Sequence, residues 1–179
     1  LKMITNSKGT DPCIHIQCAG SAEVPSTGPA KIKFQGYSGD AVDLRDYGFD
    51  APVVYDINGI DLKQSIPILY DHDQPIGHTT SVRKMDNGSA LRGKGLASLP
   101  NETTTMVVEG MKNGFPWQAS MGLTVRSFDD FSFHGKGTTV TVNNREFKGP
   151  IYVANKSSLR EMTVTGFGRD SDTSFEYLN

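Results

Sequence analysis

Ser120 lies in a segment of alternating character, residues 117–125, and its hydroxyl group is the first candidate for chemistry in this chain. The apolar residues of the alternation share one face of a predicted strand, whereas Gln118, Ser120 and Gly122 share the other. A serine hydroxyl becomes an effective nucleophile only when a histidine within hydrogen-bond reach takes its proton and a third group orients the imidazole. Most serines on exposed strand faces are merely solvated, so the strand alone does not show that Ser120 is a nucleophile.

His72 is the best candidate for that base among the four histidines. It stands between Asp71 and Asp73, directly after the short apolar run 66–70. His78 begins a predicted strand, and His15 and His134 occur in segments that look structural or exposed. A competing interpretation takes two imidazoles and a carboxylate, those of His72, Asp73 and His78, as the ligands of an open zinc site.

Glu161 offers a carboxylate on the polar face of another predicted strand, residues 159–165. Met162 and Val164 face one way along this strand, whereas Glu161 and Thr163 face the other. Chance alone would supply a serine, a histidine and a carboxylate in almost any chain of this size. The residue types therefore suggest a triad, and only their geometry in the fold can decide it.

The segments around these residues are short and β-rich, with turn residues between them, which favours a single all-β or α+β domain over βαβ units. Asn87 and Gly88 readily take the positive φ angles of a tight hairpin turn, and a second hairpin is expected across Asn143 and Asn144. The segment 39–59 has no clear pattern. The predicted strands cover residues 11–18, 31–37, 78–85, 90–97, 117–125, 138–142, 145–147 and 159–165.

One helix is predicted between Asn101, which can cap its start, and Gly114, which can end it. Within this helix we expect Met106, Val107 and Met111 to face the core.

The composition is that of an ordinary globular protein of 179 residues with a net charge of -2. This charge gives no reason to expect nucleic acid or an anionic membrane as a partner, and no apolar run approaches a membrane span. The first residues lack the features of a secretory signal, so we expect the chain in the cytosol. Cys13 and Cys18 form neither a disulfide framework nor a common zinc pattern, and no cofactor or metal is expected.

Three blocks, taken together and in order, resemble the prohead (capsid maturation) proteases of tailed bacteriophages. They are Ile-Pro-Ile-Leu-Tyr-Asp-His-Asp at 66–73, Trp-Gln-Ala-Ser-Met-Gly at 117–122 and Leu-Arg-Glu-Met-Thr-Val at 159–164, with the predicted helix between the first two. The similarity covers roughly residues 31–175. The N-terminal 30 residues have no clear counterpart, and 131–148 looks like an inserted hairpin within a single 179-residue domain.

The resemblance implies a predominantly β, α+β fold, a closed β-barrel with a few flanking helices like that of the herpesvirus assembly protease. It also implies that Ser120 is the nucleophile, His72 the general base and acid, and Glu161 the orienting group, for which Asp71 or Asp73 could substitute. An oxyanion hole is required as well. We expect it in the loop after the last strand, at Gly166, Gly168 and Arg169.

By the same resemblance, the chain would be a serine endopeptidase that cuts scaffold protein, or the scaffold-like extension of the major capsid protein, and itself. It would act inside the viral procapsid in the host cytoplasm, as a homo-oligomer. The chain ends soon after the third block, as a self-processed form would. The alternative is a non-catalytic structural component of a capsid or tail, in which Ser120, His72 and Glu161 need not converge.

Overall fold

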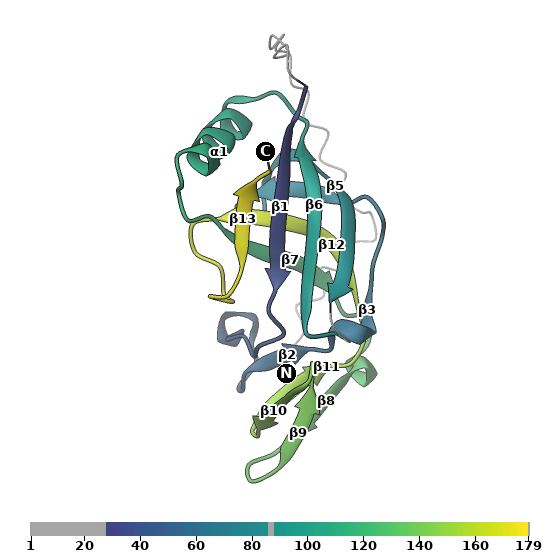
Figure 1. Ribbon diagram of the computed structural model, residues 1–179. Helices are drawn as coiled ribbons and strands as arrows, with labels where there is room; N and C mark the ends of the chain where they lie inside the picture. The colour runs from purple at the N-terminus through teal and green to yellow at the C-terminus, as the bar shows by residue number, and fades with distance from the viewer. Residues whose placement is uncertain (1–27, 86–87, 179) are drawn as a thin grey trace, which may run out of the picture.

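The computed structural model describes residues 28–85 and 88–178. The largest of its three sheets carries most of the fold (Figure 1). Its strands run in the order β13-β1-β6-β5-β4-β12-β3, and β7 pairs with β12. Their bounds are β1 Ala30–Tyr37, β3 Ile60–Asp61, β4 Pro67–Tyr70, β5 Gln74–Met85, β6 Ala90–Ala97, β7 Gln118–Thr124, β12 Ser157–Thr165 and β13 Ser174–Tyr177. The expected strand at 11–18, together with His15, Cys13 and Cys18, lies outside the described residues.

The expected closed barrel with several helices is wrong: the described residues form open, mixed sheets with a single α-helix. The reason lies between β7 and β13, where no ladder forms within the described ranges. One backbone hydrogen bond, from Phe175 N–H to Trp117 O, joins their ends, and the Thr173 hydroxyl bonds to Ala119 O. A barrel needs a continuous ladder at every neighbouring pair of strands.

The helix α1, Glu102–Lys112, forms where the sequence predicted it. The Asn101 side chain accepts a hydrogen bond from Thr104 N–H, and Gly114 follows the helix at φ 77°. Val107 and Met111 are buried as expected, but Met106 is 47% exposed, so that part of the prediction was wrong. The buried stripe is Thr104, Val107, Val108 and Met111, whose spacing of three and four residues defines one helix face. No helix in the described ranges combines the length and apolar character needed to cross a membrane.

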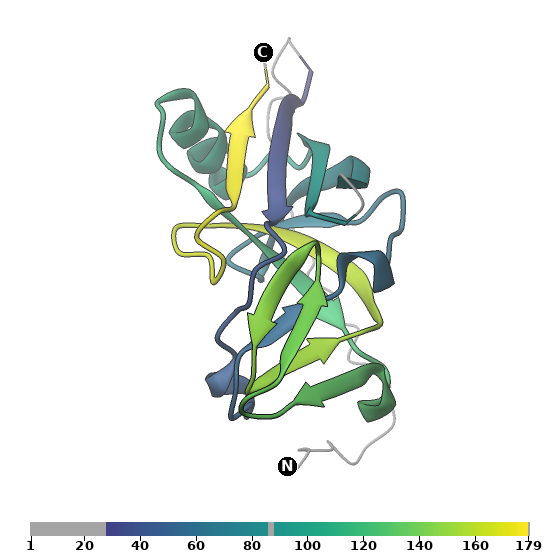
Figure 2. The same ribbon diagram turned by 60° about the horizontal axis from the view of Figure 1, so that its bottom comes forward.

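The segments that the sequence left unassigned, with the region 131–148, build a smaller layer at one end of the molecule (Figure 2). A three-stranded sheet runs in the order β2-β11-β8, and a separate hairpin joins β9 to β10. Three short 3-10 helices, η1 to η3, complete the described elements. The bounds are β2 Val53–Tyr55, β8 Phe131–His134, β9 Thr139–Val142, β10 Arg145–Lys148, β11 Ile151–Ala154, η1 Arg45–Tyr47, η2 Ile57–Gly59 and η3 Phe128–Asp130.

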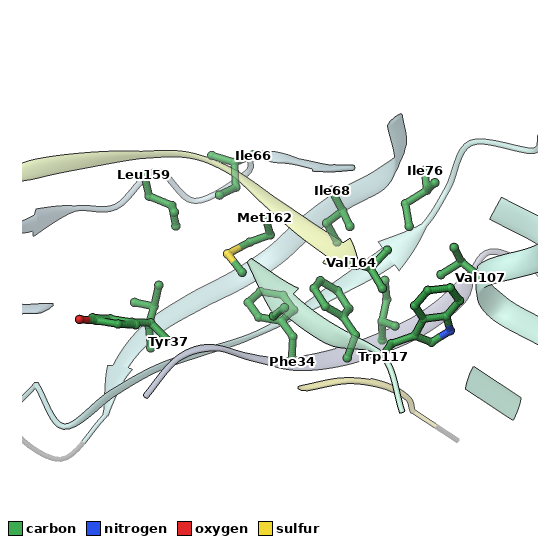
Figure 3. Close-up of a cluster of buried hydrophobic side chains, with 14 of the residues drawn as sticks. Phe34, Tyr37, Ile66, Ile68, Ile76, Val107, Trp117, Leu159, Met162 and Val164 are labelled. Carbon is green, nitrogen blue, oxygen red and sulfur yellow. The ribbon is translucent and has the colours of Figure 1, made fainter. Parts of the chain in front are cut away.

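The main core lies between the strand β12 and the strands that face it across the molecule (Figure 3). Leu159, Met162 and Val164 of β12 are fully buried, and Met162 points toward Phe34 of β1. Complete burial of each such side chain contributes about 1.5 to 3 kcal/mol to folding. The strand that carries Glu161 is therefore one of the most strongly held parts of the fold.

Asn143 fastens the β9–β10 hairpin to the rest of the molecule. Its Oδ1 accepts Ile57 N–H at 2.9 Å, and its Nδ2 donates to Gly39 O at 3.1 Å and Tyr55 O at 2.8 Å. Asn143 and Asn144 form the two-residue turn with φ 53° and 60°, a left-handed conformation that asparagine tolerates. A residue predicted only as a turn former thus also satisfies three backbone groups in a buried position.

We predict that Asn143→Gly lowers the free energy of unfolding by about 3 kcal/mol. The change leaves buried backbone groups without partners, each costing roughly 1 to 3 kcal/mol. Glycine adopts the left-handed backbone at this position freely, so conformational strain does not account for the loss. Urea denaturation of the variant beside the wild type measures the difference, and an unchanged free energy of unfolding would contradict the role given to the Asn143 side chain.

Candidate active site

Two neighbouring strands present the candidate residues in register. In the antiparallel pair of β7 and β12, Ser120 lies opposite Thr163 and Gly122 lies opposite Glu161. Since side chains alternate along a strand, Ser120 and Gly122 share one face with Glu161 and Thr163. Met162 and Val164 point into the core instead. The alternation that the sequence predicted for both strands therefore places the hydroxyl and the carboxylate on the same side of the sheet.

His72 reaches this face from the turn between β4 and β5. Asp71 and His72 have φ 46° and 62°, and Asp73 N–H closes the turn on Tyr70 O. Asp71 N–H also bonds to Val164 O, which ties the turn to β12. The strand β4 itself runs parallel to β12, with Tyr70 paired to Val164. The turn is therefore fixed to the strand that carries Glu161.

The three side chains form one hydrogen-bonded chain. His72 Nε2 lies 3.0 Å from Ser120 Oγ, and His72 Nδ1 lies 2.8 Å from Glu161 Oε1. A carboxylate can only accept, so Nδ1 carries the ring proton and the neutral imidazole leaves Nε2 free to accept the serine hydroxyl. This is the arrangement in which an imidazole can take the proton of a serine nucleophile.

Thr163 adds a fourth side chain to these hydrogen bonds, and the sequence did not indicate it as a site residue. Its hydroxyl donates to Glu161 Oε2 at 2.7 Å and is fully buried. The carboxylate is thus held at both oxygens, by the imidazole and by the threonine, and its side chain is only 14% exposed. The available signal was its position two residues after Glu161 on one strand, which puts both on one face.

Gly122 leaves the space that the carboxylate occupies. A Cβ atom at this position would lie 2.3 Å from Glu161 Oε1 and 2.7 Å from its Cγ. The sequence showed only that a glycine follows Ser120 by two residues. The structure gives the reason: a side chain here would displace the group that orients His72.

The pKa of His72 is raised above its usual value, chiefly by the hydrogen bond to Glu161, which favours the imidazolium form. Partial burial opposes this rise, and the negative charges of Glu161 and Asp71 add to it. The positive charge of Arg169 lowers the pKa again. The structure therefore gives the orienting contact to Glu161, whereas the Asp71 carboxylate acts on the imidazole through its charge and Asp73 contributes through the backbone of the turn.

The loop after β12 carries the residues expected to bind an oxyanion. Gly168 N–H donates to Gln118 Oε1 at 2.6 Å, and Phe167 N–H donates to Thr165 Oγ1. The Gly168 donor is therefore engaged within the chain, and an oxyanion role for it would require this bond to Gln118 to break. Gly168 instead allows close packing, because a Cβ there would lie 2.9 Å from Ala119 O.

Arg169 and Gly166 lie on either side of that loop segment. The Arg169 guanidinium bonds to Asp43 O and Asp46 Oδ2, which anchors the loop to the segment around η1. Gly166 has open space around its Cα, since a Cβ would meet no atom within 4 Å. Phe167 between them is 94% exposed. An oxyanion-binding role for Gly166 and Arg169 stays a prediction.

The alternative zinc site is not assembled. His78 Nδ1 bonds to Ser98 Oγ at 2.8 Å, whereas His72 bonds to Ser120 and Glu161. Within residues 28–85 and 88–178, no group of three or more His, Cys, Asp or Glu side chains is arranged to hold a metal ion. His134 lies near Ser132 Oγ, at 3.3 Å, in the smaller sheet.

The chain matches no protein-family model, no curated protein and no solved structure. The geometry of this site and the sequence blocks around its residues are therefore what indicate a function for the chain.

We predict that Glu161→Gln lowers the pKa of His72, because the amide removes the charge that stabilises the imidazolium while keeping the shape of the side chain. NMR titration of the imidazole resonances measures the shift, with the wild-type chain titrated alongside as the reference. The His72 resonances are assigned by their loss in His72→Gln. An unchanged His72 titration in Glu161→Gln would mean that the contact does not form in solution.

We predict that Gly122→Ala has the same direction of effect on His72 without changing any ionisable group. The added methyl group must push the Glu161 carboxylate away from the imidazole, so the pKa of His72 falls. Gly135→Ala is the matched control, since a Cβ there would approach only Phe133 Cε1, at 4.0 Å. If His72 titrates in Gly122→Ala as it does in Gly135→Ala and the wild type, the position of the Glu161 carboxylate does not depend on the space at Gly122.

Proposed function

We propose that the chain is a serine endopeptidase. The observation that carries this proposal is the hydrogen-bonded chain from Ser120 Oγ through the His72 imidazole to Glu161, with 3.0 Å and 2.8 Å for its two links. Two features independent of the residue types support it. The histidine stands on a left-handed turn tied to the strand of Glu161, and a glycine leaves room for the carboxylate.

In the proposed reaction, Ser120 Oγ attacks the carbonyl carbon of a peptide bond while His72 Nε2 takes its proton. Glu161 stabilises the imidazolium and keeps Nδ1 protonated. The imidazolium then gives its proton to the leaving amine, and an acyl enzyme remains on Ser120. Water, activated by the same nitrogen, hydrolyses the ester and restores the hydroxyl. The raised pKa of His72 implies that activity rises with pH until the imidazole is neutral.

The three sequence blocks that carry the triad support a more specific proposal, a role in phage capsid maturation. The substrates would be the scaffold protein or the scaffold-like extension of the major capsid protein, and the enzyme itself. Cleavage would take place inside the procapsid, in the host cytoplasm, by a homo-oligomer. Enclosure in a small volume raises the effective concentration of enzyme and substrate, so weak individual contacts suffice there.

We predict that a fluorophosphonate probe adds once to the wild-type chain and not to Ser120→Ala. Intact-mass analysis measures the adduct and needs no knowledge of the substrate. Ser132→Ala is the matched control, because Ser132 Oγ also has an imidazole nitrogen nearby, at 3.3 Å. A wild-type chain that stays unlabelled, or one whose label depends on Ser132, would contradict the nucleophile assigned here.

The substrate is tested by co-expressing the wild type, Ser120→Ala or Ser132→Ala with the scaffold and capsid proteins. Defined truncations of the partners or of the chain should occur with the wild type and Ser132→Ala and vanish with Ser120→Ala. Labelling without such truncations would keep the serine chemistry and reject the maturation role. Neither labelling nor truncation, with normal assembly, would favour a non-catalytic structural component.

A further inference from the structure

Four cationic side chains gather on the outward face of three adjacent strands of the large sheet, away from the Ser120 site. Their arrangement follows from the register. Lys33 of β1 lies opposite Lys94 of β6, and Arg92 of β6 lies opposite Arg83 of β5. All four line one shallow hollow on this face. We call these residues the basic face: Lys33, Arg83, Arg92 and Lys94.

Without an occupant, the basic face destabilises the sheet. Like charges directly opposite each other across two strands repel, and the basic face contains two such pairs. Compensation within the chain is incomplete. Lys33 pairs with Glu176 at 2.8 Å, and Arg92 Nε donates to the neutral Gln35 at 2.8 Å. Among the described residues, no carboxylate forms an ion pair with Arg83, Arg92 or Lys94. Three cations in a chain of net charge -2 thus face solvent without a counter-charge.

The surface between these cations is hollowed. The hollow has a volume of about 520 Å³, and Ser81, Met85 and Glu176 line it together with the four cations. Gly93 alternates with the two outward cations of β6 and faces the core, where a Cβ would lie 2.4 Å from the Phe34 ring. An occupant would contact the cations and, beside Lys33, the carboxylate of Glu176. No residue of β7 or β12 lines it.

The spacing of the cations indicates what kind of anion fits. Arg92 and Lys94 are two residues apart on one strand, so their side chains project from positions roughly 6.8 Å apart. An extended polypeptide with acidic residues at alternate positions repeats its carboxylates at the same interval. Duplex DNA is favoured less, because its binding depends on a broad positive field, which a chain of net charge -2 does not provide.

We propose that the basic face binds an acidic, extended segment of a partner polypeptide. Carboxylates of the segment pair with Arg92, Lys94 and Arg83, and its backbone lies over the hollow. Binding relieves the repulsion between the opposed cations. Because this repulsion destabilises the free protein, its relief makes the binding free energy more favourable. This proposal does not depend on the serine chemistry, because the two surfaces share no residue.

The test uses a fluorescein-labelled peptide of five glutamate-serine repeats and the matching glutamine-serine peptide, with fluorescence anisotropy as the readout. We expect the glutamate peptide alone to bind, with an affinity that falls as salt is raised. The double variant Arg83→Gln, Lys94→Gln should bind at least tenfold more weakly. Its thermal unfolding midpoint should not fall, since one charge leaves each repulsive pair.

The matched control is Lys63→Gln, Lys136→Gln, which changes the net charge equally at two exposed positions outside the hollow. It should retain the wild-type affinity within about twofold. Equal losses in both double variants would show a response to net charge and overturn the proposal, as would no binding by the wild type. A labelled DNA duplex that binds more tightly than the glutamate peptide would assign the surface to nucleic acid and also overturn it.

Discussion

The carboxylate of Glu161 is the contact on which the rest of the site depends. One oxygen accepts the Nδ1 proton of His72 and the other accepts the Thr163 hydroxyl, so neither the position nor the rotation of the group is free. This double anchoring fixes the tautomer of the imidazole and thereby directs the Nε2 lone pair to Ser120. The ring of His72 is half exposed, and hydrogen bonds at both of its nitrogens hold it in place.

The strand β12 connects that contact to the stability of the fold. It pairs with β3, β4 and β7, and one of its faces supplies Leu159, Met162 and Val164 to the core. The opposite face holds Glu161 and Thr163, and its backbone binds the turn of His72 through Val164 O. A shift of β12 by one residue would exchange the two faces and lose the core and the site together. Selection for a packed core therefore also preserves the alignment of the triad.

The sequence predicted what local periodicity controls and missed what depends on partners distant in the chain. The alternation around Ser120 and Glu161 was enough to place both on polar faces, and Asn101 with Gly114 was enough to bound the helix. The helix face was misjudged at Met106 because the stripe was read from residue type, whereas Thr104 and Val108 fill it. The barrel was wrong because closure depends on whether β7 and β13 form a ladder, a non-local property that no pattern within either strand reports. Thr163 was overlooked as a partner because its role appears only once the rotamer of Glu161 is known.

Opposing charges around His72 keep the pKa of its imidazole from rising as far as Glu161 and Asp71 alone would raise it. Glu161 and Asp71 raise the pKa of the imidazole, which strengthens it as a base but also increases the share that is already protonated and cannot accept a proton. Arg169, held in place by Asp43 and Asp46, counteracts this through its positive charge. Burial acts in the same direction as Arg169. In the proposed reaction, a peptide substrate that covers the half-exposed ring would add to that burial, so its binding would shift His72 toward the neutral form that can take the proton of Ser120.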